Sequence, residues 1–167
     1  MNLDELPDGT RVFIDANLLI YGLRRTSCQC LGLLARCNAS AVEGVITTVV
    51  VAEYGHRRMM EEARARGLVG SNPARALAGH PELVRQLTTS ASEVRALLGG
   101  GLSVMPVLPD DFHVALEFQR QFGLLTNDSL NLAVARRLGL TALATADQGF
   151  DAVHSFIVYR PTDLVRP

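Results

Sequence analysis

Four carboxylates stand where apolar segments end or helices begin. Asp15 follows the apolar residues "VFI", and Asp147 follows the short segment "ALATA". Glu53 lies within "VVVAEYG", about one turn into a helical segment, and Asp128 lies in the polar opening of "TNDSLNLAVARRLG". Burying an unpaired carboxylate is costly. We therefore expect these side chains at exposed edges or beside a partner.

A divalent cation is the partner that would explain all four carboxylates together. In doubly wound sheets, ligands bind in the crevice outside the carboxyl ends of the strands. Carboxylates converging there would repel one another unless a cation held them. Hard cations such as Mg2+ and Mn2+ prefer oxygen ligands, and such a site can acidify a bound water and clamp a phosphodiester. The expected chemistry is phosphodiester hydrolysis.

Each carboxylate also has an ordinary explanation when taken alone. Asp128 fits the start of a helix, where a negative charge is favourable, and Asp147 fits a turn. Glu53 is harder to explain this way, because apolar residues surround it. It is the shared position of the four that favours a functional site.

The elements expected to position these carboxylates alternate between short apolar strands and longer helices. This alternation is typical of an α/β fold with a parallel sheet covered on both faces. The expected strands cover 11–15, 44–47, 102–106, 141–144 and 155–159. The expected helices cover 17–24, 27–38, 48–66, 81–98, 110–122 and 127–138. Residues 67–80 are rich in Gly and Pro and are expected to form a surface connection or a broken helix.

Composition places the 167 residues in one globular domain, 1–167, with 48% hydrophobic and 20% charged residues. No apolar run is long enough for a membrane span, and the acidic N-terminal segment lacks the apolar region of a signal peptide. We therefore expect a cytoplasmic protein with no membrane partner.

The basic residues are all arginine, and the formal net charge is −1. Overall charge therefore does not indicate nucleic-acid binding. Five arginines nevertheless gather in one region, at Arg57, Arg58, Arg64, Arg66 and Arg75. Arginine suits bidentate phosphate contact, although a solvated helix face explains such a run equally well. Phosphate binding and a solvated face both stay open.

Three cysteines, Cys28, Cys30 and Cys37, lie within ten residues. Their spacing, without a nearby histidine, matches common zinc sites poorly. Disulfides are unusual inside cells. We expect three free thiols on or beside a helix.

The sequence resembles the PIN domain family, most closely its VapC-type toxin ribonucleases. The segments that carry the resemblance are "FIDANLLIYGL", "TTVVVAEY", "LTNDSLNLAVARRLGL" and "ALATADQGFD", which span nearly the whole chain in this order. The resemblance implies a PIN-like three-layer α/β/α fold with a five-stranded parallel sheet. It also implies endoribonuclease activity that depends on Mg2+ or Mn2+.

The same resemblance implies roles for particular residues and partners. Four residues match the catalytic, metal-holding acids of the family: Asp15, Glu53, Asp128 and Asp147. Asn17 and Thr145 match small polar positions that support such a site, and Asp151 is an additional acid. RNA is the implied substrate, an antitoxin the implied protein partner, and a homodimer the implied assembly. His56, Arg57 and Arg58, just beyond Glu53, are our candidates for phosphate contacts.

Two other classes of function remain as alternatives. One is a PIN-like module that binds RNA or protein without cleaving, although retention of all four acids argues against it. The other is a phosphatase or phospho-acceptor domain. The haloacid dehalogenase pattern needs a second aspartate where this chain has Asn17, and both phospho-transfer patterns usually need a lysine, which this chain lacks.

The chain is longer than a compact toxin of this type, and the excess lies between residues 64 and 100. Contact with RNA, contact with a partner and a longer helical hairpin are three open explanations for this segment.

Overall fold

A five-stranded sheet, all of it parallel, forms the centre of the larger of two compact units. The structure is a computed structural model that describes residues 1–164. The sheet unit comprises Met1–Val50 and the described residues from Gly101 onward, and the helical unit comprises Val51–Gly100. The strands are β1 (Arg11–Ile14), β2 (Glu43–Thr47), β3 (Leu102–Met105), β4 (Ala142–Ala144) and β5 (Ile157–Tyr159). The predicted five-stranded parallel sheet is confirmed. The prediction of one domain over 1–167 stays a prediction, and its last three residues lie outside those described.

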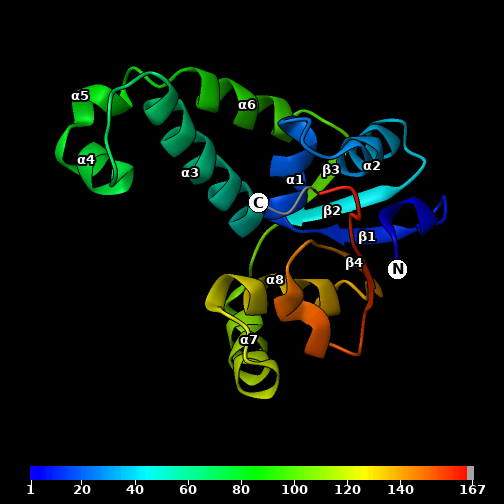
Figure 1. The fold of residues 1–167 in the computed structure, drawn as a ribbon. Coiled ribbons are helices and arrows are strands. Elements are labelled where there is room, and N and C mark those ends of the chain that lie inside the picture. Colours follow the sequence, from blue (N-terminus) through cyan, green and yellow to red (C-terminus); the bar gives the residue numbers. More distant parts are fainter. Residues whose placement is uncertain (165–167) are drawn as a thin grey trace. The chain divides into compact units, whose positions relative to one another are not determined.

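The strand order is β3-β2-β1-β4-β5. From β1 the chain continues outward to β2 and β3, then returns to form β4 on the other side of β1 and continues outward to β5, which is a reversal of direction. Parallel strands are joined by right-handed crossovers. The reversal therefore puts the connections on opposite faces: α1 and α2 lie on one side of the strands, and α7 and α8 on the other (Figure 1). The carboxyl ends of β1 and β4 form the topological switch point, where doubly wound sheets bind ligands.

Helices in the sheet unit agree with the expected ranges to within two residues. They are α1 (Ala16–Leu23), α2 (Cys28–Asn38), α7 (Pro109–Phe122) and α8 (Thr126–Arg137), with short 3-10 helices at Leu3–Glu5 and Gln148–Ala152. Gly139 follows α8 with φ of 67°, a conformation that favours glycine and ends the helix. The edge strands β3 and β5 are partly exposed, whereas the three central strands β1, β2 and β4 bury nearly all their side chains, with Val12, Ile14 and Val45 fully inaccessible. Burial on both faces explains their continuous apolar character.

The helical unit is built from α3 (Thr48–Ala65), α4 (Pro73–Gly79), α5 (Pro81–Val84) and α6 (Thr89–Leu98). α3 begins directly after β2 and continues into this unit. The unit has an apolar core of its own, made by Met60, Ala63, Leu77 and Leu87.

The sequence prediction was wrong about one helix of this unit. The single helix expected over 81–98 is interrupted between Val84 and Thr89. The reason is a non-local cap: the Glu62 carboxylate on α3 accepts hydrogen bonds from the backbone N–H groups of Thr89 and Ser90 at 3.1 and 2.8 Å. Those bonds satisfy the first donors of α6 and fix its start. Of the two options for 67–80, the structure shows the broken helix, because α4 occupies half of it.

Among residues 1–164, no helix is both long and apolar enough to span a bilayer.

Candidate active site at the carboxyl edge of the sheet

Asp15 leaves the sheet at the carboxyl end of β1 and caps the helix that follows. Its backbone N–H still bonds to the carbonyl of Ala144 on β4 at 3.0 Å, but its side chain lies at the N-terminus of α1 and accepts from the Ala16 N–H at 2.7 Å. The side chain is buried, with the residue 6% exposed. The strand therefore ends one residue earlier than predicted, and the carboxylate is stabilised by the helix start.

Thr145 links Asp15 to the loop after β4. Its hydroxyl donates to Asp15 Oδ2 at 2.7 Å and accepts from the backbone N–H of Asp147 at 3.0 Å. Thr145 is completely buried, so these bonds form away from bulk water and are costly to lose. The hydroxyl thus joins two of the four predicted acids in one network.

Asn17 completes this network between the two strand ends. Its Nδ2 donates to Asp15 Oδ2 at 2.6 Å and approaches the Thr145 hydroxyl at 3.4 Å. Its Oδ1 accepts from the backbone N–H of Ala146 at 3.1 Å. Asn17 therefore ties the start of α1 to the loop after β4 with both ends of its amide.

Asp147 is exposed and lies at the start of the 3-10 helix Gln148–Ala152. Its Oδ1 accepts from the Gly149 N–H at 2.7 Å, which orients the carboxylate. Arg160, at the end of β5, holds the same loop: Nη1 donates to the Asp147 carbonyl at 2.6 Å and Nη2 to Asp151 Oδ1 at 2.5 Å. Asp151 is thereby ion-paired at the rim of the network.

Asp128 lies in the first turn of α8. One turn later, Asn131 Oδ1 accepts from the hydroxyl of Thr47, the last residue of β2, at 2.6 Å. Residues three apart on a helix have Cβ atoms about 5–6 Å apart, so Asp128 lies close to the carboxyl edge of the sheet. Asn131 is 1% exposed, and its Nδ2 has no hydrogen-bond partner among the described residues. A buried unpaired donor indicates room for an acceptor or a water there.

Glu53 belongs to the helical unit and lies in the second turn of α3. Its Oε1 forms an ion pair with Arg57 Nη2 at 2.7 Å, one helical turn away. His56 and Arg57 are exposed. Arg58 instead bonds to Glu93 at 2.5 and 2.8 Å and also to Glu61, so its guanidinium is held by two carboxylates of its own unit.

The donor set suits a hard divalent cation. The network after β1 and β4 contains carboxylate, hydroxyl and amide groups and no thiol or imidazole, which is the chemistry that Mg2+ and Mn2+ prefer. Within residues 1–164, no three His, Cys, Asp or Glu side chains are gathered tightly enough to form a ligand group. Mg2+ usually takes only one or two carboxylates and completes its shell with water and substrate phosphate, so the residues fit such an ion.

The three cysteines take no part in this network. Cys28 is exposed, Cys30 and Cys37 are buried, and all three are free thiols, as expected. Burial raises the pKa of the Cys30 thiol to about 11 and also raises the pKa of Cys37. Both buried thiols are therefore unreactive near neutral pH.

Sequence reasoning missed Arg160, Thr47 and Asn131. Asn131 carried a usable signal, because it is a polar residue within an apolar helix face three positions after Asp128. Arg160 carried none, since its partners lie 9 to 15 residues earlier, across a loop.

These features define an α/β protein whose polar side chains meet at the switch point of a parallel sheet. The sequence matches the PIN domain model over residues 12–155, which is most of the chain. The chain belongs to the PIN domain family.

Solved structures share its fold at low sequence identity. VapC20 of Mycobacterium tuberculosis, described as a sarcin-ricin loop cleaving toxin, is 18% identical with a TM-score of 0.58, covering 93% of this chain and 99% of that one. VapBC2 from Rickettsia felis, bound to a promoter DNA fragment, is 13% identical with a TM-score of 0.58, covering 91% and 99%. A toxin-antitoxin complex from Klebsiella pneumoniae is 15% identical with a TM-score of 0.56, covering 87% and 95%. No curated protein matches the chain significantly.

Proposed function

We propose that this chain is a metal-dependent endoribonuclease, the toxin of a VapBC-type toxin-antitoxin pair. The observation that carries the proposal is the network of Asp15, Asn17, Thr145 and Asp147 at the switch point between β1 and β4. A member of the PIN family with carboxylates at this edge has the groups that phosphodiester hydrolysis needs. The helical unit and the sheet unit together form the proposed nuclease domain.

Asp15, Glu53, Asp128 and Asp147 are the proposed ligands of Mg2+ or Mn2+, directly or through water. When bound, the cation supplies an acidified water and neutralises charge on the phosphate. Thr145 and Asn17 fix the orientation of the Asp15 carboxylate through Oδ2. Such supporting groups commonly set metal affinity. Arg160 holds the backbone that carries Asp147.

The proposed partners follow the solved relatives. A complex of toxin with antitoxin appears among them, and VapC20 is described as a sarcin-ricin loop cleaving toxin. We extend these features to this chain: RNA as the substrate, an antitoxin as the protein partner, a homodimer as the assembly and the cytoplasm as the compartment.

One alternative has a specific observation in its favour. The ion pair with Arg57 occupies Glu53, which suits a PIN-like module that binds without cleaving. Cleavage distinguishes the two functions, because a binding module leaves RNA intact with or without Mn2+.

Cleavage of RNA in the presence of Mn2+ tests the proposed function. The wild type should cut RNA and lose this activity in EDTA, and Asp15→Asn and Asp128→Asn should each abolish it. Asp110→Asn is the matched control, because Asp110 is an exposed carboxylate in the first turn of α7. Cleavage at the wild-type rate by either site variant would overturn the assignment.

A further inference from the structure

The helical unit carries an excess of positive charge, unlike the rest of the chain. Residues 51–100 contain seven arginines and five glutamates, whereas the remaining residues contain nine arginines and twelve acids. The helical unit therefore carries more positive than negative charge, whereas the remaining residues carry more negative than positive charge.

All five glutamates of this unit are engaged within it. Glu53 pairs with Arg57, Glu61 and Glu93 with Arg58, and Glu82 with His80. Glu62 caps α6 and approaches Arg66 at 3.6 Å. Four exposed arginines are left whose guanidinium groups bond to no described residue: Arg64, Arg75, Arg85 and Arg95. The excess charge is therefore at the surface and without internal neutralisation.

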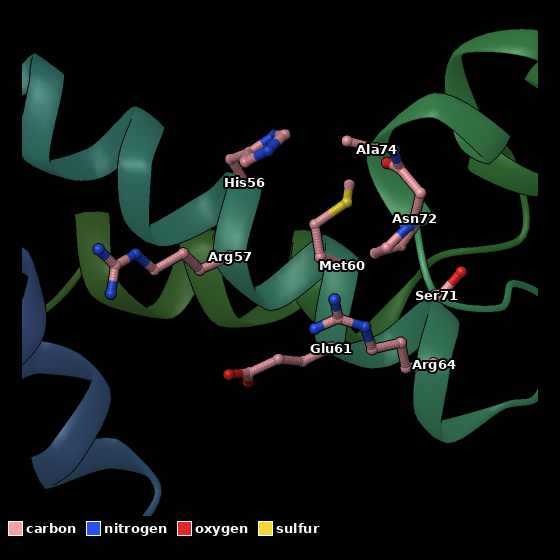
Figure 2. A pocket seen from close by; sticks show the side chains of 9 residues that line it. His56, Arg57, Met60, Glu61, Arg64, Ser71, Asn72 and Ala74 are labelled. Carbon is pink, nitrogen blue, oxygen red and sulfur yellow. The ribbon is translucent and has the colours of Figure 1, made fainter.

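One of these arginines lines a groove of about 470 Å³ inside the helical unit. His56, Met60 and Arg64 follow one another at four-residue intervals along α3, so they lie on one face of that helix. Figure 2 shows this face opposite Ser71, Asn72 and Ala74 at the start of α4. The lining also contains the carboxylate of Glu61, which forms an ion pair with Arg58. We call the polar part of this lining, made by His56, Arg57, Glu61, Arg64, Ser71 and Asn72, the arginine groove.

We propose that the arginine groove binds the phosphate backbone of single-stranded RNA. Arginine, hydroxyl and amide donors are the groups that contact phosphate oxygens, and Arg64 offers a guanidinium with no competing carboxylate partner among the described residues. This inference rests on the proposed function, because it assigns part of the RNA contact of that enzyme to the segment between residues 64 and 100.

Binding at this groove is independent of base sequence. Contacts to phosphate carry no information about base sequence. Residues 51–100 contain no Phe or Trp, and their single Tyr, Tyr54, is 1% exposed, so the groove offers no Phe, Tyr or Trp for base stacking. An acidic protein segment is the competing ligand. Protein interfaces centre on apolar and aromatic anchors, and the groove offers only Met60, Pro73 and Ala74 as apolar lining. RNA is therefore the better fit.

The test is the salt dependence of RNA binding by the full chain in EDTA, where cleavage is suppressed. Fluorescence anisotropy with a labelled oligouridine gives the dissociation constant over a range of salt concentrations. The binding constant K falls as salt rises, and for a single strand each lost phosphate contact reduces the magnitude of the slope of log K against log salt by about 0.7. We expect Arg64→Gln to weaken binding and reduce the magnitude of the slope by about 0.7, and Arg64→Gln combined with Arg57→Gln, at the other arginine of the groove, to reduce it by about 1.4.

Arg120→Gln is the matched control, because Arg120 is exposed on α7 and its guanidinium bonds to no described residue. An unchanged slope in the Arg64 variants, or an equal loss in the control, would overturn the proposal. Displacement of the RNA by polyglutamate at equal charge concentration would overturn it in favour of an acidic protein. Arg64-dependent binding without any cleavage in Mn2+ would support the groove and refute the ribonuclease. Cleavage without Arg64-dependent binding would support the ribonuclease and refute the phosphate-binding groove.

Discussion

Replacing Thr145 by valine removes one buried hydroxyl while keeping the shape of the side chain. The hydroxyl donates to Asp15 Oδ2 at 2.7 Å and accepts from the Asp147 N–H at 3.0 Å. Hydrogen bonds to charged groups contribute about 1.5–3 kcal/mol, and an unsatisfied buried donor costs about 1–3 kcal/mol. Asp15 keeps its bonds from Ala16 and Asn17. We therefore expect the free energy of unfolding to fall by about 2–3 kcal/mol.

Urea unfolding followed by far-ultraviolet circular dichroism measures this loss. With a slope of about 1–3 kcal/mol per molar urea, the midpoint should fall by about 1 M or more without a change in slope. Because the same hydroxyl orients a proposed metal ligand, Mn2+-dependent RNA cleavage measured in the native state should also fall by about 10- to 100-fold.

Thr145→Ser is the control, because serine keeps the hydroxyl and loses only a methyl group. It should retain cleavage and lose about 1 kcal/mol of stability. A valine variant that unfolds at the wild-type urea concentration and cleaves at the wild-type rate would refute the role assigned to this network.

Three further predictions concern other parts of the chain. Burial would raise the pKa of Glu62, but the hydrogen bonds from α6 lower it from 4.5 to about 2. A carboxylate with a lowered pKa stabilises the fold above its unfolded pKa, so up to about 3 kcal/mol of unfolding free energy should be lost as pH falls from about 5 to about 2. Glu62→Gln should flatten this pH dependence in acid unfolding curves. Arg160→Met should speed amide hydrogen exchange in the loop after β4 and reduce cleavage about tenfold, with protection in β1 unchanged. A thiol reagent at neutral pH should label Cys28 quickly, and Cys28→Ser should remove the fast phase; rapid labelling of a buried cysteine would contradict the structure.

The sheet and its acidic edge could be predicted because their signals are local. The apolar strands that end at Asp15 and at "TAD" indicate where the chain leaves the sheet. A parallel sheet brings those strand ends to one edge. For residues 67–80 the sequence left a surface connection and a broken helix open, and the structure shows α4 beginning at Pro73 with Asn72 as its N-cap.

Long-range contacts explain what the sequence did not reveal. The break before α6 depends on Glu62, which caps residues 27 and 28 positions later. Arg160 donates a hydrogen bond to the carbonyl of Asp147 in the loop after β4. No local sequence pattern around Arg160 or in that loop predicts this contact. Such interactions appear only once the fold brings distant segments together.

The central claim is that the carboxylates at the strand ends hold a divalent cation. Calorimetric titration of Mn2+ into the wild type and Asp147→Asn tests it most directly, with Asp110→Asn as the charge-matched control. We expect saturable Mn2+ binding by the wild type and the control, and binding weakened at least tenfold by Asp147→Asn. Absence of saturable binding in the wild type, or equal affinity in all three proteins, would show that these carboxylates do not hold the cation.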